Sequence, residues 1–219
     1  MKSAVANLGF ILRIFAGYII LSLACFLMLR TVIGYTSFRD DVQFLAQKQA
    51  YVGNPVWKCA FYIHVFSAVV GLLAGFTQFS KQFLRDHRQW HRWFGRIYVT
   101  VILVVNVPAG LVMGIYANGG MLGKTAFLVL DCLWFLSTYR GYVNARQKNF
   151  PAHKNWMIRS YALTLSAISL RTWKIILSHS FHIDMAQLYI IDAWLGFVPN
   201  LLVAEAIIRM RKKTAGSKN

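Results

Sequence analysis

The sequence predicts an all-α fold, an integral membrane bundle of six transmembrane helices. Of its 219 residues, 57% are hydrophobic and only 14% are charged, which is more apolar than a soluble domain of this size can accommodate in its core. Six apolar stretches reach the roughly 20 residues that a helix needs to cross a hydrocarbon core. They lie near 10–33, 57–80, 95–117, 123–146, 156–178 and 185–209. We therefore expect residues 1–219 to form a single transmembrane domain.

The first three predicted helices carry small, polar and kinking residues. The first follows Lys2 and has no small-residue cleavage site behind it, so we expect a retained helix and not a removed signal peptide. The second has Gly71 and Gly75 four residues apart, a spacing that lets a neighbouring helix approach closely. The third places the polar Asn106 inside the span, and Pro108 is expected to kink it.

The last three predicted helices place charged residues inside the bilayer. At 1.5 Å of rise per residue, these charges and one histidine of the second helix lie about 10 Å below the outer face. We name this set the outer polar cluster: His64, Asp131, Arg171, Lys174 and Asp192. Charged side chains at such depth cost roughly 2.5–3.5 kcal/mol each, so they should face the bundle interior and pair. Two interpretations stay open, a functional site and ion pairs that only hold the bundle together.

Lysine and arginine are concentrated in three segments, and this bias predicts the orientation. The basic segments are 81–96, 140–159 and the tail after 208. The connections on the opposite side, 30–58, 117–124 and 178–185, carry fewer basic residues or offset them with acidic ones. We therefore expect both termini in the cytoplasm. The net charge of +17 is divided among short clusters and does not form one basic face, so we expect no nucleic-acid partner.

Two basic segments begin predicted helices with the same residue types, "HRQWHRWFGR" (87–96) and "AHKNWMIR" (152–159). Tryptophan and arginine are favoured at the membrane interface, so one interpretation is a pair of interfacial anchors. The other is a shared anion site, because helix N-termini add positive potential. An anionic lipid headgroup, phosphate or carboxylate would then bind His91, Arg92, Arg96, His153 and Arg159.

Several motifs together resemble a known family. They are His64, "GFTQF" (75–79), "HRWFGRIY" (91–98), "HKNWMIRSYALT" (153–164) and "LRTW" (170–173). In this combination the chain is similar to the bacterial predicted membrane proteins of domain of unknown function 2306, over about residues 60–175. The resemblance implies a multi-helix membrane fold and no established reaction. We accordingly expect a multi-pass protein of the bacterial cytoplasmic (inner) membrane.

Histidines raise the prospect of haem b, which needs two imidazoles at one depth on facing helices. The candidate ligands are His64 with His179 or His182 on the outer side, and His91 with His153 on the inner side. The alternative for His64 is a hydrogen bond to Asp131 or Asp192. The three cysteines have no C-x-x-C spacing and the acidic residues form no paired motif, so we expect no metal-ion site.

Two classes of function remain compatible with the sequence. The first is a redox-linked membrane protein that handles haem b or a quinone through the outer polar cluster. The second is a non-enzymatic carrier of a small molecule or lipid, or an accessory subunit. The chain has no glycine-rich phosphate loop, no H-E-x-x-H and no G-x-S-x-G motif, so ATP-driven, zinc-protease and serine-hydrolase mechanisms find no support.

Overall fold

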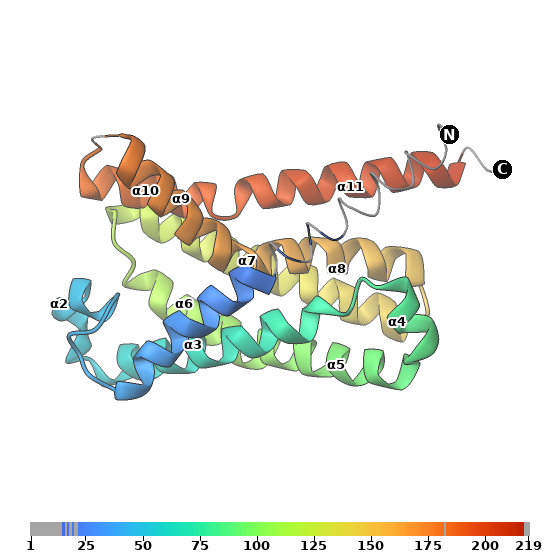
Figure 1. Ribbon diagram of the computed structural model, residues 1–219, viewed down its shortest axis with the longest axis horizontal. Helices are drawn as coiled ribbons and strands as arrows, with labels where there is room; N and C mark the ends of the chain where they lie inside the picture. The colour runs from blue at the N-terminus through green and yellow to red at the C-terminus, as the bar shows by residue number, and fades with distance from the viewer. Residues whose placement is uncertain (1–14, 16, 18, 20–21, 182, 217–219) are drawn as a thin grey trace.

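The computed structural model describes residues 15, 17, 19, 22–181 and 183–216. These residues form helices and connections, with no strand among them, arranged as an elongated bundle (Figure 1). The longer helices are α3 (Pro55–Phe76), α5 (Arg88–Thr100), α6 (Val107–Ile115), α7 (Gly120–Arg146), α8 (Phe150–Thr164), α9 (Ser166–Ser180), α10 (Met185–Leu195) and α11 (Val198–Gly216). Shorter ones are η1 (Gly34–Ser37), η2 (Leu45–Gln47), α2 (Gln49–Val52) and α4 (Lys81–Asp86). The all-α prediction is confirmed for the described chain.

Within the described residues, four segments are long and apolar enough to cross a membrane: Pro55–Gly75, Arg88–Ile115, Gly120–Arg146 and Met185–Thr214. They correspond to the second, third, fourth and sixth predicted spans. The first predicted span, 10–33, lies partly outside the described residues, and its described part belongs to a shorter apolar helix, Ser22–Ser37. The fifth, 156–178, falls on α8 and α9, which are separated at Leu165.

Asparagine, aspartate and proline residues fix the starts of three helices. The Asn54 side chain accepts hydrogen bonds from two backbone N–H groups of the first turn of α3, with Pro55 in the first helical position. Asn149 caps α8 through the N–H of Ala152, and Asp184 caps α10 through the N–H of Ala186. Such caps satisfy N–H groups that have no partner within the helix.

A π-helix connects α5 to α6 and replaces the simple kink that the sequence predicts at Pro108. It covers Val101–Asn106, and the N–H of Val107 donates to the carbonyl of Ile102, five residues earlier. Proline has no N–H, so the helix cannot keep its ordinary ladder at Pro108. Short π-helical turns of this kind occur frequently at functional sites.

The centre of the bundle packs around aromatic side chains of α5, α7 and α8. Tyr98, Trp134 and Tyr161 belong to this main core. Gly75 permits the close approach that its spacing predicts, because a Cβ atom there would lie 2.3 Å from the Tyr161 ring. At Gly71 the nearest side-chain atom would be 3.8 Å away, an ordinary contact.

A second, smaller core lies at the end of the bundle near α2 and includes Leu45, Trp57 and Phe61. It belongs to an outer cap, residues 34–54, which covers the start of α3. Lys48 of this cap is buried, and its Nζ donates to the carbonyl of Tyr116 at 2.7 Å and to Oδ1 of Asn118 at 2.6 Å. These bonds join the cap to the α6–α7 connection.

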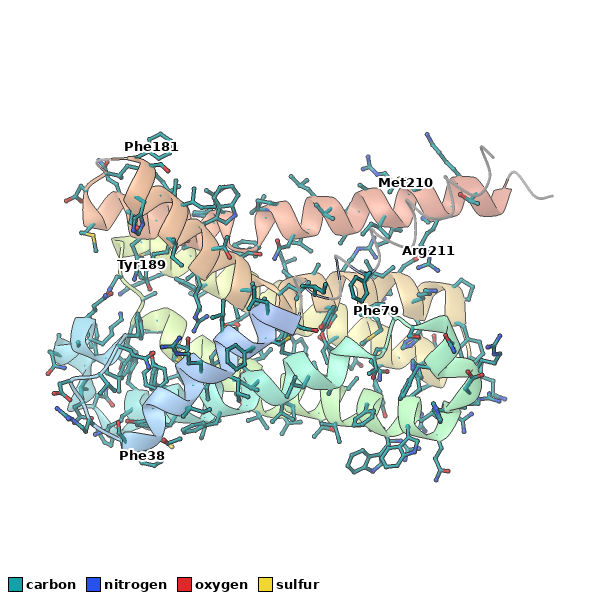
Figure 2. The ribbon with its side chains drawn as sticks, viewed as in Figure 1. Phe38, Phe79, Phe181, Tyr189, Met210 and Arg211 are labelled. Atoms are coloured by element: carbon teal, nitrogen blue, oxygen red, sulfur yellow. The ribbon has the colours of Figure 1, made fainter. Side chains whose placement is uncertain are left out.

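The basic segments all lie at the opposite end of the bundle. Figure 1 shows α4, the start of α5, the α7–α8 connection and the C-terminal end of α11 together on the right. Large apolar side chains also project outward, as Figure 2 shows for Phe38, Phe181 and Met210, which are 61%, 57% and 60% exposed. An apolar outer surface and segregated charges fit helices that are surrounded by lipid.

Candidate functional site

His64 of the outer polar cluster contacts the π-helix. Its Nδ1 lies 3.4 Å from the backbone carbonyl oxygen of Asn106. Because that oxygen can only accept, this contact favours the tautomer with the proton on Nδ1. The opposite ring nitrogen, Nε2, is then a hydrogen-bond acceptor, and no side chain of the described residues binds it. The imidazole can therefore accept a proton or a hydrogen bond from a bound molecule.

The position of Asn106 beside His64 is not predicted by the sequence. Its side chain is fully buried, and neither Oδ1 nor Nδ2 has a hydrogen-bond partner among the described residues. A buried amide without partners costs roughly 1–3 kcal/mol for each unsatisfied group, and such groups in a native fold call for an explanation. The sequence shows Asn106 inside an apolar span, but only the π-helix reveals that it adjoins His64.

Asp131 lies one helical turn from this contact. Its side chain is 5% exposed and packs against Gly110, where a Cβ atom would lie 2.7 Å and 2.8 Å from the two carboxylate oxygens. Asn106 and Gly110 are four residues apart and hence on one face of the helical segment. Glycine at position 110 therefore makes the room that Asp131 occupies.

Arg171 does not pair with Asp131, the partner expected from sequence and depth. No ion pair between them occurs within the described residues. The physical reason is that α10 packs against both α7 and α9, with the Tyr189 ring 5.9 Å from that of Phe127. Arg171 instead donates from Nη1 to the carbonyl of Ala167 at 2.7 Å.

Asp192 on α10 takes the place expected for Asp131. Its side chain is 3% exposed, and it interacts electrostatically with Lys174 and Arg171 without an ion pair closer than 4.0 Å. Its Oδ1 is buried and lacks a hydrogen-bond partner in the described part of the chain. Arg171 also lies within range of a charge interaction with His64. Charge interactions thus connect four members of the outer polar cluster. Asp192 and Arg171 interact with each other, Lys174 interacts with Asp192, and His64 interacts with Arg171.

An apolar groove is lined by residues that precede His64 in α3 and Asn106 in the π-helix. It is open, has a volume of about 620 Å³ and separates α3 from the π-helix and α6. One wall includes Val56, Cys59 and Ile63, and the other includes Val104, Pro108 and Val112. Sequence patterns gave no sign of this groove, because it arises from how two helices are spaced.

The histidines proposed as haem ligands differ in exposure and in their contacts. His179 is exposed, and its Nδ1 contacts the carbonyl of Ile175 at 2.9 Å. His182 lies outside the described residues. His91 and His153 interact with each other electrostatically, but Nδ1 of His153 is 2.8 Å from the carbonyl of Gly141. In the parts of the chain that are described, no three His, Cys, Asp or Glu side chains form a group able to hold a metal ion.

The residues of the predicted anion site differ in whether their charges are available to a ligand. Arg92 and Arg96 are exposed at the surface, and His91 keeps a buried Nδ1 without a partner. Arg159, in contrast, forms a two-point ion pair with Glu205 of α11, with one N–O distance of 3.0 Å, and covers the Trp156 ring at 4.7 Å. Its charge is largely used within the protein, so it ties α8 to α11.

A hydroxyl network that sequence reasoning missed lies deeper in the bundle. The hydroxyl of Tyr98 is 2.8 Å from Oγ of Ser160 and 2.7 Å from Oγ1 of Thr164. Thr138 Oγ1 is 2.7 Å from Ser160, and Nε1 of Trp134 donates to Thr164 at 3.2 Å. The available signal was the i, i+4 spacing of Ser160 and Thr164 within one of the quoted motifs.

The helical bundle, its apolar exterior and its buried charges define a multi-helix integral membrane protein. The profile of the predicted membrane proteins of domain of unknown function 2306 matches residues 61–208. The chain therefore belongs to this family, which confirms the resemblance drawn from the motifs. Neither the curated proteins nor the solved structures yielded a match.

Proposed function

We propose that the outer polar cluster, together with Asn106, binds the oxygen-bearing head group of a quinone in a redox-linked protein of the bacterial cytoplasmic membrane. In this proposal the chain crosses the membrane six times, with both termini in the cytoplasm. The observation that carries the proposal is Asn106, a fully buried amide with both polar atoms unpartnered beside His64. A ligand that supplies the missing hydrogen bonds would explain this arrangement.

The chemistry of the cluster suits a quinone in both oxidation states. The oxidised head group presents two carbonyl oxygens that accept hydrogen bonds, for which Nδ2 of Asn106 and the guanidinium of Arg171 are donors. The reduced head group presents two hydroxyls, for which Nε2 of His64 and the carboxylates of Asp131 and Asp192 are acceptors. If a redox partner removes two electrons from the quinol, these same groups can take up the two protons that it releases.

The groove favours a lipid-soluble ligand over a polar solute. Its walls carry no charged or amide side chain, and they include Ile63, the residue before His64 in α3. A carrier for polar solutes would need polar groups along its entry path. Haem b remains the other part of the redox hypothesis.

Quinone binding to the purified chain in lipid nanodiscs tests the proposal. We expect Asn106→Leu and His64→Leu each to weaken the binding of a short-tailed benzoquinone at least tenfold, about 1.4 kcal/mol. His179→Leu is the matched control, because this exposed histidine lies outside the cluster. Calorimetric titration gives the dissociation constants. Equal constants for all three variants and the wild type would contradict the proposal, and a Soret band lost in His64→Leu would point to haem instead.

A further inference from the structure

We infer that the groove between α3 and the Val101–Ile115 segment holds the isoprenoid tail of the ligand, which enters sideways from the outer leaflet. The inference rests on the proposed function and narrows its substrate class to long-tailed quinones confined to the membrane. Short-tailed or water-soluble quinones would satisfy the head-group site and leave the groove unfilled.

The groove offers contacts for hydrocarbon and little else. Its lining consists of proline, valine, isoleucine and alanine side chains with one thiol, that of Cys59. Val56 and Val104 on opposite walls are 63% and 67% exposed, so they are accessible from the surrounding lipid. The volume of about 620 Å³ lies within the range of pockets that hold small molecules.

The proposed head-group residues each follow a lining residue of the groove. Ala60 and Ile63 line one wall, and His64 follows Ile63 directly in α3. Val105 lines the other wall, and Asn106 is the next residue of the π-helix. A tail that lies in the groove therefore brings its head group to the contact between His64 and Asn106.

The contact between His64 and Asn106 is weak. It is a single hydrogen bond of 3.4 Å, and one partner is a carbonyl at the end of a π-helix. Hydrogen bonds of this length are close to the geometric limit and contribute little. Separating His64 from Asn106 thus opens a path for the head group at small cost.

The shape of the lining favours a tail over a helix of a second copy. Helix–helix interfaces within membranes are enriched in small residues and interhelical hydrogen bonds. The exposed lining residues of this groove are instead branched: Val56, Ile63 and Val104. A flexible chain can follow such a surface, whereas a rigid helix would leave gaps.

Two quinones with the same head group and different tails test the inference in nanodiscs. Val104→Trp fills the groove at a position that is already exposed, so the fold should be kept. We expect this variant to weaken a four-isoprene quinone at least tenfold and a one-isoprene quinone less than twofold. Leu73→Trp is the matched control, because Leu73 is an exposed α3 residue outside the groove lining, and it should change neither constant.

The outcomes separate this inference from the proposed function. If the short-tailed quinone binds through His64 while Val104→Trp leaves the long-tailed one unaffected, the groove assignment fails and the proposed function stands. An equal loss for both quinones would show an effect on head group or fold and would also overturn the tail assignment. A wild type that binds neither quinone overturns both, and disulfide-linked dimers through Cys59 would assign the groove to a second copy.

Discussion

The hydroxyl network and the outer polar cluster are both buried polar regions, yet they differ in how their groups are satisfied. Each side chain of the network has a hydrogen-bond partner at 2.7–3.2 Å; the network consists of Tyr98, Trp134, Thr138, Ser160 and Thr164. In the outer polar cluster, Asp192 keeps a buried oxygen without a partner, and neighbouring Asn106 keeps two such atoms. Satisfied polar groups within a membrane join helices, whereas unsatisfied ones call for an explanation, which the proposed ligand would supply at Asn106.

The difference concerns packing as well as hydrogen bonds. Around the network, side chains fill the space left by small residues, as the Tyr161 ring does at Gly75. Beside the outer polar cluster an open groove of about 620 Å³ remains. The region around the network is therefore closely packed at Gly75, whereas the outer polar cluster has an open groove nearby.

The largest effect should come from filling the close contact in the inner region. We expect Gly75→Ala to lower the free energy of unfolding by roughly 2–3 kcal/mol, because its new Cβ would lie 2.3 Å from a ring atom of Tyr161. Gly71→Ala is the control, since the contacts of its Cβ are ordinary, at 3.8 Å. Unfolding in mixed detergent measures both. Equal losses would mean that the inner region is not tightly packed at Gly75.

The next effect contrasts one polar group from each region. Tyr98→Phe should destabilise the bundle by about 1 kcal/mol, because Ser160 and Thr164 lose a shared partner. Asn106→Leu should be neutral or stabilising, because it removes a buried amide that has no partner. The same unfolding assay decides. A larger loss for Asn106→Leu than for Tyr98→Phe would reverse the comparison.

A smaller effect separates two arginines. A double-mutant cycle with Arg159→Leu and Glu205→Leu should give a coupling of about 0.5–1 kcal/mol, because this ion pair is formed and partly exposed. The cycle with Arg171→Leu and Asp131→Leu should give a coupling near zero, since these two residues do not pair. A coupling energy for Arg171 and Asp131 larger than that for Arg159 and Glu205 would show that Arg171 and Asp131 pair, as the sequence predicts.

The smallest effect is a pH dependence at the outer cap. Burial, with a contribution from Lys124, lowers the pKa of Lys48 from 10.5 to about 8. Between these values the unfolded chain binds more protons than the folded one, so stability should rise with pH from about 8 to about 10.5. The melting temperature of the wild type minus that of Lys48→Met should rise over this range. A difference that falls over this range would show that the folded cap prefers the ammonium form.

Sequence patterns identified the spans because apolar length is a local property. The four described segments that qualify by length and hydropathy match predicted spans to within seven residues at each end. The same locality explains why the sequence predicts that Asp131 and Asp192 are buried. A carboxylate inside an apolar span faces the bundle interior, because exposing it to lipid is costly. The fifth predicted span does not qualify, because Ser166, Ser169 and Arg171 make its sequence too polar.

The contacts between helices could not be predicted in the same way. Depth placed Arg171 level with Asp131, but depth does not say which helix lies between two others, and α10 packs against both α7 and α9. The partnership of Tyr98 with Ser160 joins residues 62 positions apart. The π-helix at Asn106 depends on how the chain compensates for Pro108, which no periodicity records.

The separation of α8 from α9 has a consequence for biogenesis. Each of these helices has 15 residues, too few for a full span, and their joint segment is not among those apolar enough to cross alone. A translocon recognises segments by their own hydrophobicity, so this one needs help to enter the bilayer. Because α8 packs along α7, we expect the two helices to insert together as a hairpin. The apolar α7 would then offset the cost of inserting the more polar α8.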